Sequence, residues 1–513
     1  MHQFRQILYN SVSKASKKSI KAVNGFPRPL STIDHPPGVK NVPQFGIPQG
    51  ILGQPTCHTH PHLISSDHLT CGITQTEYKE RRDVLVSKLY AEADNKHKTH
   101  IIVIPAACKQ YMSDKIPYVF RQNSDFFYLT GCLESSAVLI LIKPAQTDRY
   151  KSILFVHEKD SHAELWEGPR TGCSAAVKLF AVDEALPVED LAKFLNKTTQ
   201  SSKPSILWYH NDVPSNPEIH STVRSVLRND AAVTLSDPER TLHFMRVIKS
   251  PAEVSLMKET CYIGAQSINM AMACTKPGIS EHYVNAVLDY SGRQSGAEHP
   301  AFPPVVAGGS RATHIHYITN NQILTKHDLL LVDSGTQRWL YNSDISRTWP
   351  VSGKFTKHQR ILYELVLTVQ KRLIQLLGEY RPPLDQLFDH MCRLLGRHLQ
   401  EEGILDKNIG GNELIGRAYR LCPHHVSHYL GLDVHDTPRV RRHSAVQTNM
   451  IVTVEPGIYI RPDDDMVPVE FRGVGIRVED DVLITDGEPY VMTDSCAKEV
   501  DDIEAIVGKH SGS

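Results

Sequence analysis

Short apolar runs alternate with helical stretches from about residue 72 onward. Residues 75–94, QTEYKERRDVLVSKLYAEAD, have helical propensity, and residues 189–195, EDLAKFL, show a similar pattern. Four other runs are almost entirely apolar and are predicted to be buried strands: HIIVIPA (100–106), AVLILI (137–142), SILFV (152–156) and SILWYH (205–210). Buried strands separated by helices predict an α/β domain with a central sheet, which we expect to end near residue 240.

A second unit begins at residues 249–261, KSPAEVSLMKETC. Ser250 is placed to cap a helix, Pro251 suits its first turn, and Glu253 lies three residues after the cap, as a capping box requires. Apolar residues then recur at spacings of three and four, which predicts a core-facing helix: Val254, Met257, Cys261, Ala265, Ile268 and Met272. A further helix is predicted over residues 357–378, with Gly378 as its stop and two prolines just beyond.

The first 50 residues differ from the rest of the chain. Residues 1–33 contain six Lys and Arg residues, several serines and no acidic residue, and apolar residues recur there at helical spacing. This composition is typical of a mitochondrial presequence, with a disordered basic tail as the alternative. Prolines and glycines are frequent in residues 26–56, which predicts a linker or an extended arm.

We therefore expect an α/β (α+β) protein in three parts: residues 1–50 as leader and linker, 51–240 as an N-terminal domain, and 241–507 as a second domain. Lys and Arg total 56 against 57 Asp and Glu, so no global charge draws the chain toward nucleic acid or anionic lipid. Ten cysteines at scattered positions, with no C-x-x-C pair, indicate reduced thiols. The sequence has no run of about 18 apolar residues, so no membrane-spanning helix is predicted.

Several β-prone stretches of the second domain carry carboxylates. LLLVDSG places Asp333 at the end of an apolar run, and Asp344 follows eleven residues later in YNSDISRTWP. Glu455 follows the run IVTV, and Glu479 is expected in a strand, two residues after Arg477 and on the same face. An unpaired buried carboxylate costs several kcal/mol or becomes protonated. A strand end or a salt bridge would explain any one of them alone, but four together indicate bound cations.

Four histidines fall within the fifteen residues CPHHVSHYLGLDVHD, 422–436. Imidazole is the commonest metal ligand, although a polar surface loop could have the same composition. Two divalent cations would balance the four carboxylates, and carboxylates with one imidazole suit Mn²⁺, Co²⁺, Fe²⁺ or Zn²⁺. Such a pair of ions can hold and deprotonate a bridging water and polarise a carbonyl, so hydrolysis is the expected reaction.

The motifs LLLVDSG, YNSDISRTWP, CPHHVSHYLGLDVHD, IVTVEPGIYI and GIRVEDD, in this order, resemble those of the pita-bread metallopeptidases and, among them, the Xaa-Pro aminopeptidases. YVFRQNSDFFYLTG and ELWEGPRTG resemble the N-terminal domain of aminopeptidase P, and LGQPTCHTHPHL is similar to the segment after the leader in mitochondrial members. The resemblance covers nearly all of residues 51–506. It implies an N-terminal aminopeptidase P domain over 51–240 and a catalytic pita-bread domain over 241–507.

By position, the resemblance implies five metal ligands: Asp333, Asp344, His428, Glu455 and Glu479. Asp344 and Glu479 would bridge two metal ions. Glu455 would also pass a proton to the leaving nitrogen, and Arg477 would orient Glu455 or Glu479.

Other histidines have implied roles around the metals. His424 and His435 would act in catalysis and, together with His316, would contact the substrate and stabilise developing negative charge. At His425 many relatives have glycine, whereas the mitochondrial type has PHHV as here. His425 is therefore a marker of that type, with no chemistry assigned.

The implied activity is hydrolysis of the bond between a first residue and a second-position proline, by a hydroxide held between two divalent ions, Mn²⁺ first and Co²⁺ or Zn²⁺ as alternatives. The expected partners are peptides or protein N-termini with proline second, and a second copy in a homodimer, with no nucleic-acid or membrane partner. The expected location is mitochondrial, with a cytosolic pool as a further hypothesis. Two alternatives stay open: a prolidase that cleaves Xaa-Pro dipeptides, and a non-enzymatic pita-bread binding module.

Overall fold

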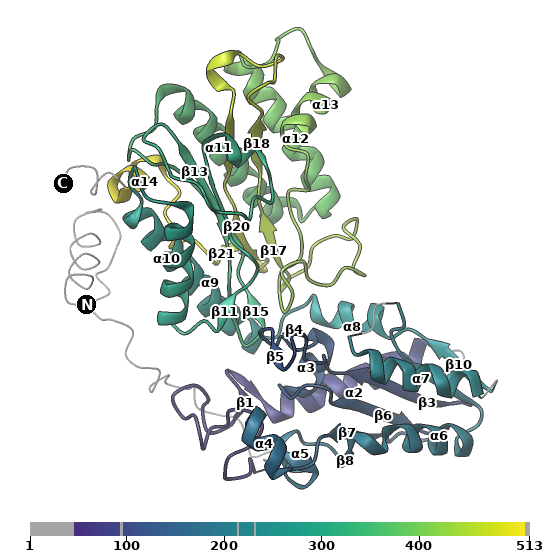
Figure 1. The fold of residues 1–513 in the computed structure, drawn as a ribbon. Helices are drawn as coiled ribbons and strands as arrows, with labels where there is room; N and C mark the ends of the chain where they lie inside the picture. Colours follow the sequence, from purple (N-terminus) through teal and green to yellow (C-terminus); the bar gives the residue numbers. More distant parts are fainter. Residues whose placement is uncertain (1–45, 93–95, 213–214, 230–231, 508–513) are drawn as a thin grey trace. The chain divides into compact units, whose positions relative to one another are not determined.

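The computed structural model describes residues 46–92, 96–212, 215–229 and 232–507 (Figure 1). It divides into two compact units, with the boundary between Arg246 and Val247. The expected presequence and most of the proline-rich linker lie outside the described residues. We describe each unit by itself.

A six-stranded mixed sheet forms the centre of the N-terminal unit. Its strands, in order across the sheet, are β10 (Val233–Ser236), β9 (Ser205–Trp208), β3 (Thr99–Pro105), β6 (Val138–Lys143), β7 (Lys151–Val156) and β8 (Glu184–Pro187). β3 pairs parallel with β9 and antiparallel with β6. The four apolar runs predicted as buried strands are confirmed as β3, β6, β7 and β9.

Helices cover this sheet. α6 (Leu191–Ser201) and α7 (Pro217–Asn229) share one hydrophobic core with alternate residues of β3, β6 and β7. α3 (Ser124–Thr130) contacts β3 and β6, and α5 (Gly172–Leu179) contacts β7 and β8. The remaining elements are β1 (His68–Thr70), β2 (Ile73–Thr74), α2 (Gln75–Glu92), β4 (Tyr111–Ser113), β5 (Ile116–Pro117), α4 (Ser161–Glu167), η1 (Val188–Asp190) and α8 (Glu239–Arg246). The helices predicted from residues 75–94 and 189–195 are confirmed as α2 and α6.

Short antiparallel strands make up the sheets of the C-terminal unit. Their orders are β12 (Val305–Gly308), β13 (Leu329–Ser334), β16 (Ile345–Pro350); β17 (Ile451–Val454), β20 (Asp480–Leu483), β21 (Tyr490–Val491); β18 (Gly457–Ile460), β19 (Val474–Arg477); and β11 (His299–Pro300), β14 (Thr336–Arg338), β15 (Tyr341–Asn342). β19 contacts β13 and β16, and β20 contacts β16. Strands distant in sequence are thereby brought together at the centre of this unit.

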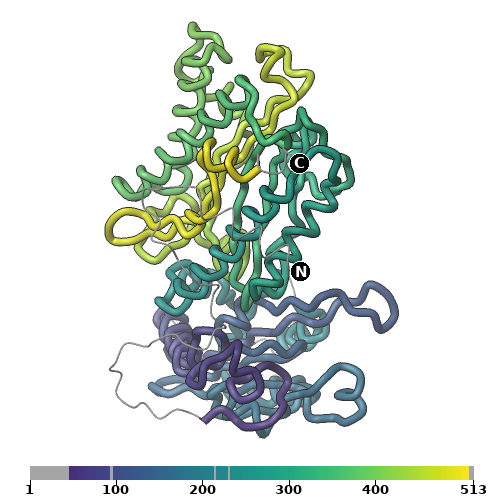
Figure 2. Tube along the Cα trace, turned by 90° about the vertical axis from the view of Figure 1, so that its left-hand side faces the viewer, coloured from purple at the N-terminus to yellow at the C-terminus, as the bar shows by residue number. Residues whose placement is uncertain are grey.

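Helices pack on both sides of these strands. α9 (Pro251–Cys274) and α10 (Glu281–Gln294) pack together and contact the strands of the first part of the unit, whereas α11 (Lys357–Tyr380) contacts β17, β18 and β19 (Figure 1). α12 (Leu384–Glu401) packs against α11 and α13 (Gly411–Leu421), which Figure 2 shows from a second direction. The unit also contains η2 (Gly309–Thr313), η3 (Val469–Phe471) and α14 (Val500–Val507).

The two helix ends predicted in this unit have different outcomes. The start of α9 is confirmed: the Ser250 side chain accepts from the Glu253 N–H, and the Glu253 carboxylate accepts from the Ser250 N–H. The stop at Gly378 is wrong, because α11 continues to Tyr380 and the left-handed residue is Arg381, at φ 47°. Gly378 has a packing role instead, since a Cβ there would lie 2.6 Å from Pro489 Cδ.

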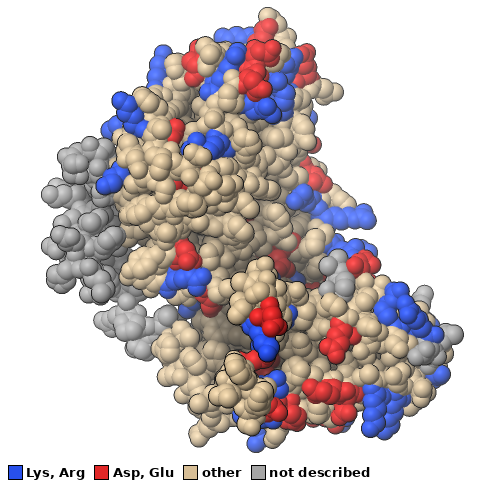
Figure 3. Space-filling model, in the orientation of Figure 1, with Lys and Arg blue, Asp and Glu red and all other residues tan. Residues whose placement is uncertain are grey.

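The face of the described residues that Figure 3 shows has mixed charge. On the face shown in Figure 3, Lys and Arg side chains are interspersed with Asp and Glu and form no continuous basic area over the described residues. None of the helices in the described part of the chain combines the length and apolarity needed to cross a bilayer.

Candidate metal centre

The five predicted ligands lie near strand ends of the C-terminal unit and in one loop. Asp333 is in β13, Asp344 directly precedes β16, Glu455 lies between β17 and β18, Glu479 lies between β19 and β20, and His428 is in the loop after α13. The expectation that Glu479 lies within a strand is therefore wrong. Arg477 ends β19, and the chain bends so that the Glu479 N–H donates to the Ser346 carbonyl oxygen of β16, at 3.0 Å.

His428 presents one ring nitrogen to the carboxylates. Its Nδ1 lies 3.1 Å from the Tyr429 carbonyl oxygen, and because a carbonyl only accepts, Nδ1 carries the proton and Nε2 keeps its lone pair. That Nε2 lies 3.4 Å from Asp344 Oδ2 and 3.7 Å from Glu455 Oε1. Single ligand atoms of Asp344, His428 and Glu479 lie within 4.8 Å of one another. All of these atoms are electron-pair donors, so the arrangement calls for a cation between them.

Burial and mutual repulsion raise the pKa values of the clustered carboxyl groups. Burial, followed by the charges of Asp333, Asp481 and Glu455, raises the pKa of Asp344 well above its usual range. Burial and then the charge of Asp344 do the same to the pKa of Glu479. Burial also raises the pKa of Glu455 to about 7. The protein alone therefore supplies too little positive charge to hold these groups ionised.

Arg477 provides one buried positive charge beside the carboxylates. Its Nη2 donates to Asp333 Oδ2 at 2.6 Å, and its Nε donates to Ser346 Oγ at 2.8 Å. The Ser346 hydroxyl in turn donates to Glu479 Oε2 at 2.6 Å. The second oxygen of Asp333, Oδ1, is buried and has no hydrogen-bond partner among the described residues. A buried carboxylate oxygen in that state, in a set of oxygen donors with one imidazole, fits divalent metal ions.

His424 is held in one tautomer by its neighbours. Its Nδ1 lies 2.9 Å from the His425 carbonyl oxygen, so Nδ1 carries the proton. Its Nε2 lies 2.9 Å from the Tyr459 hydroxyl, which therefore donates to the ring and itself accepts from Arg477 Nη1 at 2.6 Å. A chain of hydrogen bonds thus links Arg477 through Tyr459 to His424, whose Nδ1 also lies 3.7 Å from Glu455 Oε2.

The other two predicted histidines differ in their surroundings. The His435 ring packs edge-on against His428, with ring centroids 4.5 Å apart. Burial, and then the charges of His428, Arg442 and His316, lower the pKa of His435 to about 4, so its ring is neutral at physiological pH. His316 is exposed in the segment after η2. Its interaction with the centre is the electrostatic contribution to the lowered pKa of His435. A cavity of about 280 Å³ opens beside His428 and His435 and is lined further by Arg441 and Arg442.

Two residues that contact this centre are not among those predicted from the sequence. Tyr459 links Arg477 to His424, and Asp481 accepts from the Asp344 N–H at 3.0 Å and from the Cys261 thiol at 3.2 Å. Burial raises the pKa of Asp481 to about 7. The three consecutive acidic residues of VEDDV were a signal for Asp481, since a buried strand rarely contains so many carboxylates.

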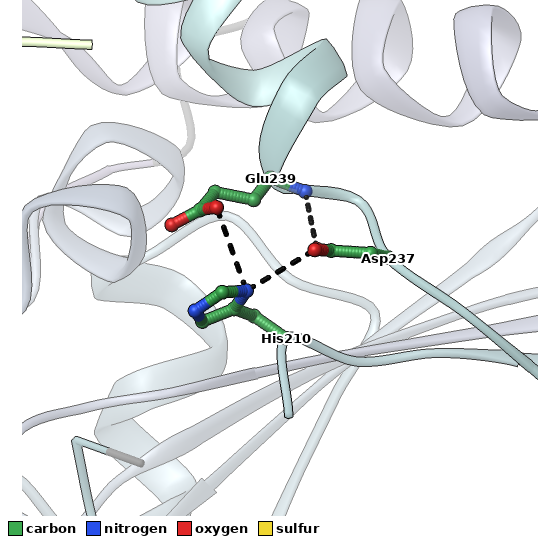
Figure 4. A group of neighbouring side chains, drawn as sticks. All are labelled: His210, Asp237 and Glu239. Atoms are coloured by element: carbon green, nitrogen blue, oxygen red, sulfur yellow. Dashed lines mark hydrogen bonds and ion pairs between the residues drawn. The ribbon is translucent and has the colours of Figure 1, made fainter. Parts of the chain in front are cut away.

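A second group with metal-binding residue types lies in the N-terminal unit. His210 Nδ1 lies 3.2 Å from Asp237 Oδ2 and 3.5 Å from Glu239 Oε2, and Figure 4 shows both side chains turned toward the ring. Both oxygens approach the same nitrogen, and because carboxylates only accept, this Nδ1 carries a proton. The Asp237 side chain is 43% exposed. This partly exposed group therefore differs from the buried centre around His428.

Two family models match the chain. Residues 255–486 match metallopeptidase family M24, and residues 78–208 match the N-terminal domain of aminopeptidase P. Both matches fall where the sequence motifs pointed.

Several curated relatives match over most of their length. Xaa-Pro aminopeptidase 3 of Homo sapiens is 39% identical over 476 residues, covering 92% of this chain and 93% of that protein. Intermediate cleaving peptidase 55 of Saccharomyces cerevisiae is 35% identical over 471 residues, covering 89% of this chain and 88% of that protein. The mitochondrial intermediate cleaving peptidase 55 of Arabidopsis thaliana is 35% identical over 462 residues, covering 90% and 88%.

Solved structures match as well. The crystal structure of Icp55 from Saccharomyces cerevisiae is 33% identical, with a TM-score of 0.77, and covers 86% of this chain and 100% of that one. The zinc-substituted Escherichia coli aminopeptidase P in complex with product is 32% identical, with a TM-score of 0.77, and covers 85% of this chain and 99% of that one. The fold of both units is thus a known one, with the expected pita-bread unit at the C-terminal side.

Proposed function

This chain belongs to metallopeptidase family M24, and from that premise we propose that it is a metal-dependent aminopeptidase that releases the first residue from peptides with proline second. Proteins named Xaa-Pro aminopeptidase match nearly its whole length, including the N-terminal aminopeptidase P domain. The observation that carries the proposal is the convergence of buried, mutually repelling carboxylates on the free Nε2 of His428.

Asp333, Asp344, His428, Glu455 and Glu479 would hold two divalent ions, for which we propose Mn²⁺, with Co²⁺ or Zn²⁺ as alternatives. When bound, the ions would supply an activated water and a polarised substrate carbonyl. Support comes from the donor set itself: four carboxylates and one imidazole suit these cations, and Arg477 balances only one of the four negative charges.

Glu455 is the proposed proton carrier. One of its oxygens faces His428 and the other faces His424. In the metal-free protein burial raises its pKa to about 7. A carboxylate between two histidines is also placed to pass on a proton. We assign it the transfer of a proton to the proline nitrogen that leaves.

The histidines around the centre would bind the substrate. His435 is neutral and lies against His428, so a ring N–H there can donate to the carbonyl oxygen as negative charge develops on it. His424 already uses both ring nitrogens, one toward the His425 carbonyl and one toward Tyr459. We therefore propose that His424 contributes the face of its ring to the substrate site. His316 is proposed to donate to the substrate from its exposed segment.

The wider setting is also proposed by analogy. Residues 51–240 would form the domain that limits substrates to short or unstructured N-termini, and residues 241–507 would form the catalytic domain. Relatives that include a protein named as mitochondrial support a mitochondrial location, with a cytosolic pool as a further possibility to test. A homodimer is the proposed assembly.

Two alternatives predict different substrates. A prolidase would cleave only Xaa-Pro dipeptides, and a pita-bread binding module would cleave nothing and would purify without bound transition metal. The presence of all five ligand residues favours an enzyme, and the match to an aminopeptidase P domain favours substrates longer than a dipeptide.

The test is cleavage of a peptide pair, X-Pro-Y and X-Ala-Y, together with the dipeptide X-Pro. The protein lacking its leader is stripped of metal and assayed with and without Mn²⁺, with Asp344→Ala as the inactive control. The proposal predicts Mn²⁺-dependent release of the first residue from X-Pro-Y, far less from X-Ala-Y, and none in the control. Cleavage of the dipeptide alone would establish the prolidase, and no cleavage by folded, metal-loaded protein would favour the binding module.

A further inference from the structure

His425, for which neither the motif nor the proposed mechanism supplies a role, makes three side-chain contacts. Its ring stacks on Phe388 of α12, with centroids 5.1 Å apart and planes inclined by 20°. Its Nε2 lies 3.1 Å from Asp385 Oδ1 in the first turn of α12, and its Nδ1 lies 3.0 Å from the Ser427 carbonyl oxygen. The side chain is only 21% exposed. His425 therefore joins the loop that carries His428 to α12.

The contact with Ser427 bears directly on the metal ligand. Ser427 and His428 share one peptide unit, whose carbonyl oxygen lies against His425 Nδ1 and whose N–H donates to Thr453 Oγ1 at 3.1 Å. Both ends of that planar unit are thus hydrogen-bonded. With this peptide fixed, and with His428 Nδ1 bound to the Tyr429 carbonyl, the direction in which His428 Nε2 points is determined.

The position of the ring proton can be assigned from the two acceptors. A carbonyl and a carboxylate both only accept, so a neutral ring can donate to one of them. Burial, and then the charge of Arg442, lower the pKa of His425 against the opposing effect of Asp385, which favours the neutral ring at neutral pH. The Asp385 side chain is 55% exposed and water can solvate it, whereas Ser427 is completely buried. Leaving the buried carbonyl without a donor costs more, so the proton belongs on Nδ1.

We propose that His425 is a positioning residue for the metal centre, which fixes the Ser427–His428 peptide through its Nδ1–H and thereby aims His428 Nε2 at the metal. The inference rests on the metal site of the proposed function. The main chain of His425 also helps to order the site, because the His425 carbonyl accepts from His424 Nδ1 and so fixes the tautomer of the His424 ring. Glycine at this position would keep the carbonyl but lose the donor.

Two substitutions distinguish the contribution of the Nδ1 contact with Ser427 from that of the Nε2 contact with Asp385. The amide nitrogen of Asn is as many bonds from Cβ as His Nδ1 is, and the amide nitrogen of Gln is as many bonds from Cβ as His Nε2 is. His425→Asn can therefore keep the donor to Ser427 and lose the contact with Asp385, whereas His425→Gln does the reverse. His425→Ala removes both. His358→Ala is the matched control, since His358 is also half-buried and packs on a phenylalanine, Phe471, with ring centroids 5.1 Å apart.

The readout is Mn²⁺ affinity, measured by calorimetric titration of metal-stripped protein, with the melting temperature of each metal-free variant measured alongside. Loss of a residue that orients a metal-binding histidine weakens affinity by about 10 to 100-fold. We expect about a 10-fold loss for the Ala and Gln variants, about twofold or less for Asn, and no change for His358→Ala.

Other results would overturn the inference. Full Mn²⁺ affinity in the Gln variant with a loss in the Asn variant would show that the contact of Nε2 with Asp385, and not that of Nδ1 with Ser427, supports metal binding. Full affinity in the Ala variant, with only its melting temperature lowered, would leave His425 as a packing residue. Absence of Mn²⁺ binding by the unaltered protein would contradict the metal site itself, and the inference would fall with it.

Discussion

Replacing Glu455 with Gln is expected to stabilise the metal-free protein at pH 8, although the same change replaces a proposed metal ligand. Burial raises the pKa of the Glu455 carboxyl from 4.5 to about 7, while its side chain keeps 16% of its surface exposed. Gln is nearly isosteric and cannot ionise. The variant therefore removes a charge that the metal-free protein holds at a cost.

The expected change in the free energy of unfolding follows from the pKa of Glu455 in the unfolded chain, 4.5, and in the folded chain, about 7. As pH rises through 4.5 the unfolded chain releases this proton, whereas the folded chain keeps it until about pH 7. The stability of the metal-free protein thus falls between these values and is level above them. A pKa difference of about 2.5 corresponds to about 3 kcal/mol, an upper bound because of the exposed edge. Relative to the unaltered protein, Glu455→Gln should gain up to about 3 kcal/mol between pH 4.5 and pH 8.

The assay is urea unfolding in the presence of a chelator at pH 5 and pH 8. Glu364→Gln, an exposed side chain 52% accessible on α11, is the control and should change stability by less than about 0.5 kcal/mol at both values. If Glu455→Gln changes stability equally at the two pH values, or destabilises more at pH 8, burial does not raise the pKa of Glu455 in the metal-free protein. Added Mn²⁺ should reverse the order, since the unaltered protein binds it more tightly.

Three further predictions concern the surroundings of the centre. Tyr459→Phe removes the hydroxyl between Arg477 and His424. The lost hydrogen bonds correspond to about 1.5 to 3 kcal/mol, so kcat/KM at saturating Mn²⁺ should fall about 10 to 100-fold while the melting temperature stays nearly unchanged. A fall below threefold in steady-state kinetics would contradict this prediction. Arg347 Nη2 and Asp480 Oδ1 form a fully buried ion pair at 2.7 Å. Asp480→Ala leaves the Arg347 cation buried without this carboxylate and should destabilise by about 3 to 5 kcal/mol in a denaturant titration, whereas a change below 1 kcal/mol would refute the contribution of the pair. Ser250→Ala should cost about 1 kcal/mol by loss of the α9 cap, and Ser250→Gly less.

The four carboxylates proposed as ligands could be predicted from the sequence because each interrupts or follows an apolar run. Asp333 after LLLV and Glu455 after IVTV are conspicuous in that way. Their immediate surroundings could not be found, because the partners are distant in sequence: Arg477 reaches Ser346 across 131 positions and Asp333 across 144. Tyr459 occupies an ordinary place in a strand, so only the fold gives it a role.

Local signals were reliable where the local backbone decides the structure. The capping box at Ser250 and Glu253 needs only neighbours in sequence, and it is present. Gly378 misled because glycine marks two different situations. It can end a helix or allow close packing, and here the neighbour that requires it, Pro489, lies 111 residues away.

The most direct test of the central claim is a count of bound metal. The protein would be stripped, loaded with Mn²⁺, freed of excess ion by gel filtration and measured by elemental analysis, with Asp344→Asn in parallel. Two ions per chain, and fewer in Asp344→Asn, is the predicted result, because Asp344 is closest to His428 Nε2 and repels Asp333 and Glu455 when no cation is present. No bound metal in the folded protein, or a content that does not change in Asp344→Asn, would contradict the account.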